Sequence, residues 1–224
     1  MRGLRDLAMR SVVPTLAATL FDGVWAEATK VVHRTRGISL GAEFFFAFDD
    51  PYSALVFQPV VDLCRRHRVA LELYPVLSRG VVGDPDDHLR RNYAVLDARR
   101  LAGDFGTVIC RETPLSRDRV ADVTAWAEAA RDRGALESFA ADCLARLWQS
   151  QVAPDYGELY AVYHHTVGSP PPKADIQLRA RVRHNDERLH QGHWDTPSVK
   201  IGGRWFFAHD RFESLESWLG ELAS

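Results

Sequence analysis

Cysteine is scarce in this sequence of 224 residues, which holds three of them: Cys64, Cys110 and Cys143. They are odd in number, lie far apart and form no C-x-x-C pair, so they exclude the disulfide framework typical of small secreted proteins. Cys64 and His67 make one C-x-x-H pair, but no second pair completes the spacing of a zinc site. These absences predict a cytoplasmic protein in a reducing compartment.

The sequence also lacks long apolar runs and an excess of charge of either sign. No stretch approaches the roughly 20 apolar residues that a helix needs to cross a bilayer. Lys and Arg number 28 against 30 Asp and Glu, for a net charge of −2, so no global basic field attracts nucleic acid. The remaining composition, 46% hydrophobic and 26% charged, is that of a globular protein with a sizeable core. We predict a protein without a membrane or nucleic-acid partner.

The N-terminal segment combines basic residues with a mildly apolar stretch at residues 11–21. A signal peptide has a more apolar core and does not usually carry an acid such as Asp6 in its charged region, so secretion is not favoured. Apolar residues recur at near-helical spacing from Leu16 to Val31. This pattern predicts an N-terminal helix.

A βαβ unit is predicted over residues 42–76. An apolar, aromatic run at residues 42–48 is typical of a buried strand, and Asp50 followed by Pro51 is a common helix start. The helix ends in a basic cluster that suits its negative pole. We expect Pro59 to kink or locally break it. Residues 69–76 form the second strand, which the crossover places parallel to the first.

The middle of the chain has helical periodicity. Apolar residues at helical spacing predict an all-helical segment over residues 83–168, with breaks at 103–106 and 114–116. A proline-rich linker, residues 169–173, separates this segment from a polar helix over residues 174–191.

The C-terminal stretch has the pattern of a β-hairpin followed by a helix. Two short apolar segments, residues 197–201 and 204–207, flank Gly202 and Gly203, which are typical of a two-residue turn. Asp210 can then cap a closing helix with one apolar face.

Histidines on the polar helix raise the hypothesis of a metal site. His184, Glu187 and His190 follow one another at intervals of three residues and could share part of a helix face. The spacing matches no known metal motif, and a solvated polar helix explains the same residues. We therefore predict no metal site.

Two patches resemble a known superfamily. Residues 44–60, FFFAFDDPYSALVFQPV, and residues 192–219, GHWDTPSVKIGGRWFFAHDRFESLESWL, resemble the DsbA-like thioredoxin superfamily. The resemblance is nearest to the branch that holds kappa-class glutathione transferases and 2-hydroxychromene-2-carboxylate isomerases. It implies an α/β protein with a thioredoxin-like fold, an all-helical insertion and an extra N-terminal helix. It divides the chain into four parts. Residues 1–40 form an N-terminal extension, residues 41–82 the first half of the core, residues 83–168 the helical insertion and residues 169–224 the second half of the core.

The resemblance also implies a site. Asp50 would occupy the position of the activating Ser, or of the first Cys in redox relatives, and Ser53 the fourth position of the same motif. We treat both as catalytic candidates. Tyr52 is a candidate ligand-binding residue. Three further ligand-binding candidates are Thr196, Pro197 and Asp210. The resemblance implies a cis peptide bond between Thr196 and Pro197, and it places Asp210 in the family's D-R turn. Glutathione, a small organic substrate and a homodimer are the partners that this family implies.

The sequence departs from the family at the position that matters for the chemistry. With Asp50 and Ser53 in the motif no dithiol exists, so disulfide exchange by the family's route is excluded. A carboxylate about 4 Å from a thiolate costs roughly 4 kcal/mol at an effective dielectric constant near 20. The helix dipole returns only about 0.3–2 kcal/mol. A nearby thiol should therefore stay protonated unless Asp50 points away.

Three hypotheses follow for the function. The first is a glutathione-dependent transferase or isomerase that acts on a small organic substrate. The second is a non-catalytic or divergent ligand-binding protein, and Asp50 in place of Ser or Cys favours it. The third is a dimeric interaction module built on the helical insertion. Asp50 itself is either a plain helix cap or a functional carboxylate, for example a general base or an anchor for a ligand.

Overall fold

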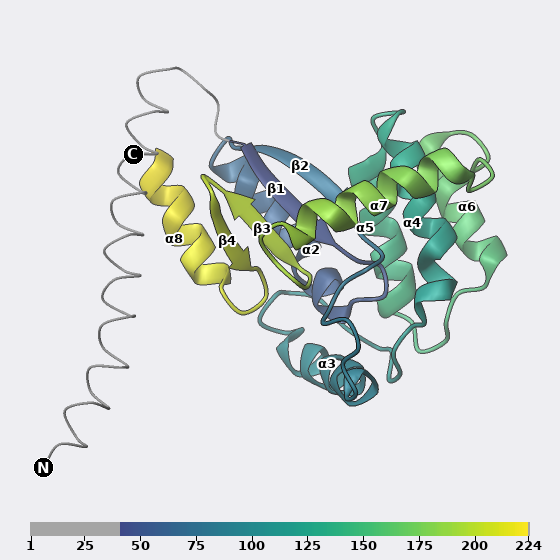
Figure 1. Ribbon diagram of the computed structural model, residues 1–224, viewed down its shortest axis with the longest axis horizontal. Helices are drawn as coiled ribbons and strands as arrows, with labels where there is room; N and C mark the ends of the chain where they lie inside the picture. Colours follow the sequence, from purple (N-terminus) through teal and green to yellow (C-terminus); the bar gives the residue numbers. More distant parts are fainter. Residues whose placement is uncertain (1–40, 224) are drawn as a thin grey trace, which may run out of the picture. The chain divides into compact units, whose positions relative to one another are not determined.

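The computed structural model describes residues 41–223, which belong to one compact unit (Figure 1). The helix predicted within residues 1–40 lies outside the described residues. At the centre is a four-stranded sheet of order β2-β1-β3-β4. Its strands are β1 (Gly41–Phe46), β2 (Ala70–Pro75), β3 (Ser198–Ile201) and β4 (Arg204–Phe207). Strands β1 and β2 run parallel, whereas β3 is antiparallel to both β1 and β4.

The predicted βαβ unit is present, with α2 (Pro51–Arg66) between β1 and β2. Asp50 caps α2 as predicted, because its side chain accepts hydrogen bonds from the backbone N–H groups of Tyr52 and Ser53. The predicted break at Pro59 is wrong, since α2 continues through it. Its buried apolar face holds the helix in place, so that the loss of one hydrogen bond does not interrupt it.

The helical insertion contains four helices, of which the last three are grouped at one end of the sheet in Figure 1 while the first lies apart from them. They are α3 (Asp87–Leu101), α4 (Arg117–Arg131), α5 (Leu136–Trp148) and α6 (Tyr156–Val167). The loop between α3 and α4 contains both predicted breaks. The polar helix predicted after the linker is α7 (Ile176–His190).

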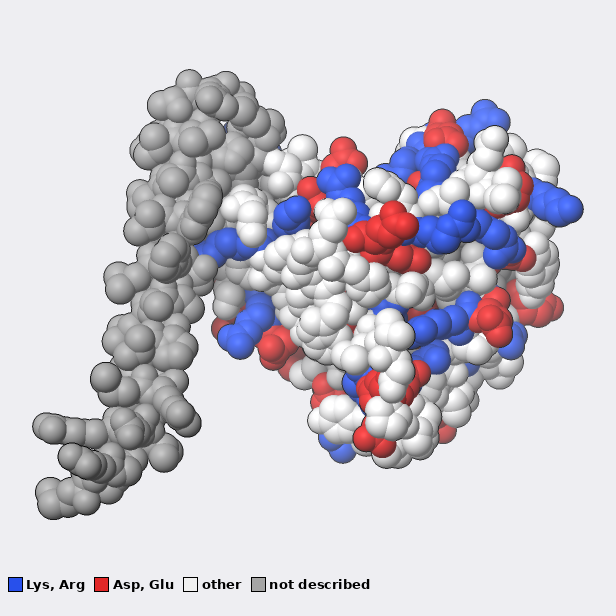
Figure 2. Space-filling view, viewed as in Figure 1, with Lys and Arg blue, Asp and Glu red and all other residues white. Residues whose placement is uncertain are grey.

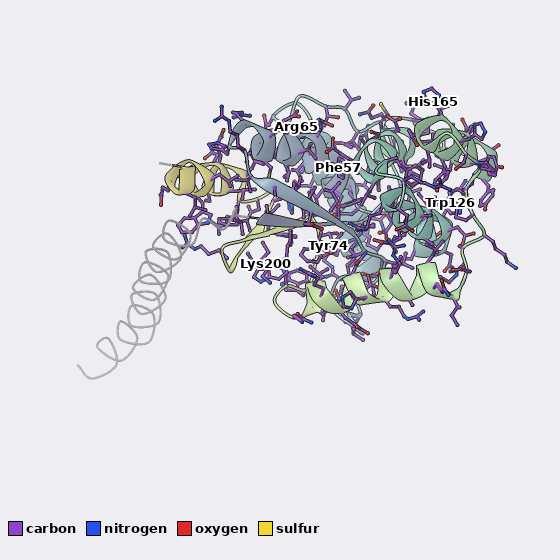
Figure 3. All side chains as sticks on the ribbon, turned by 90° about the horizontal axis from the view of Figure 1, so that it is seen from above. Phe57, Arg65, Tyr74, Trp126, His165 and Lys200 are labelled. Carbon is purple, nitrogen blue, oxygen red and sulfur yellow. The ribbon has the colours of Figure 1, made fainter. Side chains whose placement is uncertain are left out.

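The core is built on both faces of β1. Phe45 packs in a cluster with Leu189 of α7 and, partly buried, Tyr74 and Trp205. Phe44 and Phe46 contact the ring of Phe57 on α2 instead. Figure 3 shows Phe57 and Tyr74 on opposite sides of the sheet. Helices α2 and α7 therefore cover its two faces, which explains why β1 is an uninterrupted apolar run.

The hairpin and the last helix follow the predicted order, with one correction. Gly202 and Gly203 have φ values of 57° and 81°, the left-handed conformation that a tight turn between β3 and β4 requires. The predicted cap by Asp210 is wrong. Helix α8 (Phe212–Ala223) starts later, because its first turn is closed on the carbonyl of Arg211.

The surface of the described residues carries charges of both signs. Basic and acidic side chains are interspersed on the face seen in Figure 2. Within residues 41–223, no helix combines the length and apolarity needed to span a membrane.

Candidate functional site

Three segments far apart in the sequence meet at one edge of the sheet. Strands β1 and β2 are parallel, so the segments that follow them, at Asp49 and Arg79, leave from the same edge. Strand β3 is antiparallel to β1, so the segment that precedes it, at Thr196, arrives there. The topology therefore gathers the N-terminus of α2 and two loops in one place.

The carboxyl group of Asp50 occupies the N-terminus of α2. Its Oδ1 accepts a hydrogen bond from the Tyr52 N–H at 3.2 Å. Its Oδ2 accepts three hydrogen bonds, from the Ser53 N–H (3.2 Å), the Ser53 hydroxyl (2.7 Å) and the Thr196 hydroxyl (2.9 Å). The side chain is buried, at 1% exposure. Asp50 thus uses the donors that an anion bound at this helix end would need.

Burial shifts the ionisation of Asp50. Desolvation raises the pKa of Asp50 to about 6 against the opposing charge of Arg79, and the nearby Asp195 adds to the rise. The hydroxyls of Ser53 and Thr196 act in the other direction by hydrogen bonding to the carboxylate. A carboxyl group at this site therefore exchanges its proton much closer to neutral pH than an exposed aspartate does.

The loop before β3 is tied to the same centre. The Thr196–Pro197 peptide bond is cis. The backbone N–H of Thr196 donates to Oδ1 of Asp195 at 2.8 Å, so this amide is already occupied. Asp195 also accepts a hydrogen bond from Nη1 of Arg79 at 3.0 Å.

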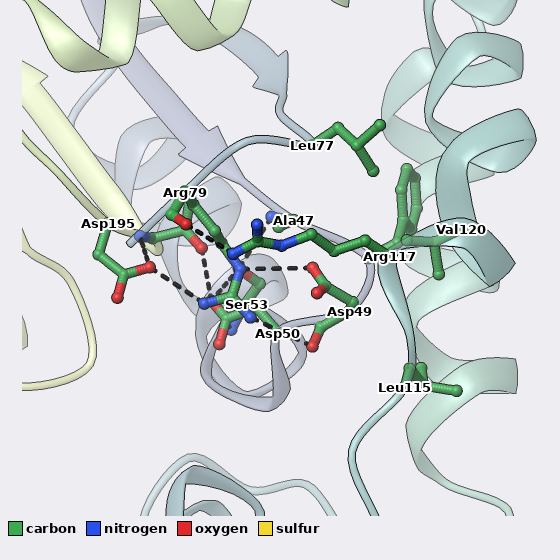
Figure 4. A network of polar contacts seen from close by, with 12 residues as sticks. Ala47, Asp49, Asp50, Ser53, Leu77, Arg79, Leu115, Arg117, Val120 and Asp195 are labelled. Atoms are coloured by element: carbon green, nitrogen blue, oxygen red, sulfur yellow. Dashed lines mark hydrogen bonds and ion pairs between the residues drawn. The ribbon is translucent and has the colours of Figure 1, made fainter. Parts of the chain in front are cut away.

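Arg79 is the central cation of the site, as Figure 4 shows. Its Nε donates to Oδ1 of Asp49 at 3.3 Å, and Nη1 reaches Asp195. Burial alone would lower the pKa of Arg79, but Asp49, Asp50 and Asp195 raise it, so the guanidinium stays charged. Arg91 of α3 contacts the other oxygen of Asp49 at 3.2 Å. The charges of Arg79 and Arg91 are therefore balanced within the protein.

An aromatic pair lies beside this network. The rings of Tyr52 and His209 are stacked, with centroids 3.8 Å apart and planes 10° from parallel. The Tyr52 hydroxyl donates to Asp97 of α3 at 2.9 Å, and burial together with this carboxylate raises its pKa. Burial lowers the pKa of His209 to about 4, so its ring is neutral at pH 7. A flat, neutral, partly apolar surface results.

These residues surround a cavity of about 200 Å³. It opens between the N-terminus of α2, the loop after β2, the starts of α3 and α4, and the loop before β3. Its lining combines four arginines and four aspartates with several aromatic rings; the aspartates are Asp49, Asp50, Asp87 and Asp195. The arginines are Arg79, Arg90, Arg91 and Arg117; the rings are those of Tyr52, Tyr93, Trp194, Phe207 and His209.

The structure brings only some of the predicted site residues to this cavity. Asp50, Tyr52 and Thr196 line it, whereas Ser53 lies buried behind Asp50 and holds its carboxyl group. Pro197 is absent from the lining.

Asp210 does not line the cavity, although its neighbour His209 does. Its side chain is exposed and pairs with the neighbouring Arg211 at 3.4 Å. The structure therefore gives it neither the predicted capping role nor a place in the cavity wall.

Most of the charged residues in the cavity lining were not predicted from the sequence. Arg79, Arg91 and Arg117 belong to no local motif, and Asp49 and Asp195 lie within the two patches of family resemblance but were not singled out as site residues. The pair Asp49-Asp50 was the one sequence signal for this charged lining. Only Asp50 caps the helix, and Asp49 is also buried, so Asp49 requires a charged or hydrogen-bonding partner.

No thiol or metal cluster accompanies the site among the described residues. Cys64 and Cys143 are buried elsewhere; burial raises the pKa of Cys64 to about 11 and also raises that of Cys143. Cys110 is half-buried and does not line the cavity. Residues 41–223 contain no group of three or more His, Cys, Asp or Glu side chains able to hold a metal ion. His184 and Glu187 are exposed, and Nδ1 of His184 lies 4.0 Å from Oε2 of Glu187.

Comparison with known proteins identifies the fold. A structure of 2-hydroxychromene-2-carboxylate isomerase (HCCA isomerase) matches with a TM-score of 0.65 and 21% identity over 81% of this chain and 95% of that chain. A probable DsbA oxidoreductase from Streptomyces coelicolor matches with a TM-score of 0.59 and 14% identity, over 81% and 91%.

A third similar structure is the cytosolic disulfide reductase DsbM from Pseudomonas aeruginosa with GSH. Its TM-score is 0.50 at 13% identity, over 82% of this chain and 97% of that chain. No protein-family model and no curated protein matches the sequence. The structural matches show that the chain has a DsbA-like thioredoxin fold, in which the cavity lies at the N-terminus of α2.

Proposed function

We propose that this chain binds a small organic acid in the cavity beside Asp50, and that its site works without thiol chemistry. The observation that carries the proposal is the position of Asp50, whose carboxyl group already accepts the two N–H groups at the start of α2 and two hydroxyls. A fixed internal anion takes the place that a thiolate would need. The site is therefore a divergent ligand-binding site on a thioredoxin-like scaffold.

Two kinds of side chain in the cavity lining define the ligand class. Arginine side chains favour a carboxylate, which matches the planar fork of a guanidinium. The stacked rings of Tyr52 and His209, with Trp194 at 47% exposure, offer flat apolar surface. A small planar carboxylate fits both. The name of HCCA isomerase, a structural neighbour, refers to an organic carboxylate, which supports the same class.

Glutathione-dependent transferase or isomerase activity is the second candidate. The likeness to HCCA isomerase and to a disulfide reductase solved with GSH favours it. Two hydrogen bonds of the site oppose this activity. The N–H of Ser53 at the start of α2 already donates to Asp50, and the N–H of Thr196 already donates to Asp195, so neither group is available to glutathione. The cytoplasmic location and the homodimer stay predictions of the sequence.

Calorimetric titration separates the two candidates. We expect 4-bromobenzoate, a planar carboxylate, to bind the wild-type protein with one saturable site. Reduced glutathione should either fail to bind or bind with a thiol pKa no lower than that in free solution, because the carboxylate of Asp50 opposes a thiolate. The thiol pKa is read from thiolate absorbance in the ultraviolet. Absence of 4-bromobenzoate binding would overturn the proposed function, and a lowered thiol pKa would establish the second candidate.

The Asp50→Ser variant provides the matched control for glutathione. If glutathione binds next to Asp50, replacing the carboxylate by a hydroxyl should lower the thiol pKa by up to about 3 units, and by less where solvent screens the charge. Serine caps a helix nearly as well as aspartate, so α2 should persist. An unchanged thiol pKa in both proteins would place the thiol away from Asp50.

A further inference from the structure

The cavity holds four arginines, and three of them are paired with carboxylates. Arg79 and Arg91 share Asp49, and Arg79 also contacts Asp195. Arg90 pairs with two acids of the adjacent loop and helix start, Asp84 and Asp87. These guanidinium charges are already neutralised by the protein, and a ligand anion would have to compete for them.

Arg117, in the first turn of α4, is different. Its Nη2 donates to the neutral backbone carbonyl of Arg79 at 2.8 Å, and its Nε is buried without a hydrogen-bond partner. Among the described residues Arg117 forms no ion pair within 4.0 Å. Its charge acts on Asp186 at longer range, but Oδ1 of that acid accepts the N–H groups of Leu77 and Ser78.

Figure 4 shows the Arg117 side chain extending from α4 toward the centre that contains Asp49 and Asp50. The side chain is partly buried and lines the cavity. A half-buried guanidinium without a carboxylate in contact has lost part of its hydration and has gained no direct ion pair in return. An anion in the cavity would supply that ion pair and could accept two parallel hydrogen bonds.

We propose that Arg117 binds the carboxylate of the ligand and determines the preference of the cavity for an anion. This inference rests on the function proposed above and adds to it the residue that recognises the charged group. The aromatic rings of the cavity lining then contact the planar part of the ligand, and the paired arginines keep Asp49 and Asp195 in place.

The test compares 4-bromobenzoate with its neutral amide, 4-bromobenzamide, by calorimetry. The two probes share size and shape and differ in charge. The variant is Arg117→Gln, and the matched control is Arg119→Gln. Arg119 lies on the same helix, also donates a hydrogen bond to a backbone carbonyl, that of Pro154 at 3.0 Å, and does not line the cavity. Both substitutions remove one positive charge.

We expect the wild-type protein to prefer the carboxylate over the amide. Arg117→Gln should weaken carboxylate binding on the order of tenfold to a hundredfold and leave amide binding within about twofold, so the preference disappears. Arg119→Gln should leave both affinities within about twofold. Arg117→Lys, which keeps the charge but loses the planar fork, should fall between wild type and Arg117→Gln.

Three results would contradict the proposal in distinguishable ways. Equal loss of both probes in Arg117→Gln would mean that the residue only supports the structure of the cavity. Unchanged carboxylate binding in Arg117→Gln would overturn the role of Arg117 while leaving the proposed function intact. Failure of the wild-type protein to bind either probe would overturn the proposed function itself.

Discussion

At the scale of single residues, Asp50 combines the roles of helix cap and buried acid. Its folded-state pKa, raised to about 6 by burial, lies above the value of about 3.9 expected in the unfolded chain. The folded protein therefore binds this proton more tightly than the unfolded one. The contribution of Asp50 to stability is greatest below the unfolded pKa and is lost as the pH rises through 6.

We predict that Asp50→Ser removes this pH dependence. Between pH 4 and pH 7.5 the wild-type protein should lose about 2–3 kcal/mol of unfolding free energy relative to the variant, which corresponds to the shift in pKa. Urea unfolding of both proteins at several pH values measures the difference. A constant difference across this range would show that Asp50 titrates normally and is not desolvated in the folded state.

Local sequence motifs revealed part of the site. Asp50 belongs to a helix-start pattern, whereas Tyr52 and Thr196 were identified only through the resemblance of their two patches to the DsbA-like thioredoxin superfamily. Arg79 and Arg117 have no such signature, because their roles depend on loops that the sheet topology brings together over long sequence distances. The residue types of Arg79 and Arg117 and of their sequence neighbours do not predict these contacts.

At the scale of elements, the junction between α7 and the hairpin depends on Gly192. A Cβ atom built on Gly192 would lie 2.3 Å from Nε1 and 2.7 Å from Cε2 of Trp205. The indole ring cannot withdraw easily, because it packs against Phe45 with ring centroids 5.3 Å apart. The absence of a side chain at this position lets the loop before Thr196 approach the sheet closely.

We predict that Gly192→Ala destabilises the protein by about 1–3 kcal/mol, the usual cost of overpacking a core. Gly103→Ala is the matched control, since a Cβ there would meet nothing within 4 Å. Thermal unfolding should show a lower midpoint for the first variant and a midpoint close to wild type for the second. Equal midpoints for all three proteins would mean that Trp205 moves aside freely.

The prediction of helices, strands and turns succeeded where the local sequence itself determines the structure. The aromatic run of β1, the Asp50-Pro51 helix start and the Gly202-Gly203 turn all formed as expected. It failed where tertiary packing decided. Pro59 did not break α2, because the helix packs along the sheet, and Asp210 is not the cap of α8, because the turn after β4 closes one residue later.

At the scale of the whole molecule, the thioredoxin-like fold gathers the start of α2, the loop after β2 and the loop before β3 around one cavity. The helix start, the cis proline and the cavity are present, but a carboxyl group stands at the helix end. Within the described residues no cysteine lines the cavity. Buried acids paired with arginines surround it instead, so the scaffold presents fixed charges rather than a reactive thiol.

The most direct test of this account is to locate a bound ligand. Crystals of the full chain grown with 4-bromobenzoate at a saturating concentration would show the bromine in an anomalous difference map. The account predicts one bromine peak inside the cavity, between the Tyr52–His209 stack and Trp194, with the carboxylate toward Arg117. A cavity without the peak, or a peak confined to another surface, would contradict the claim that this cavity is the ligand-binding site.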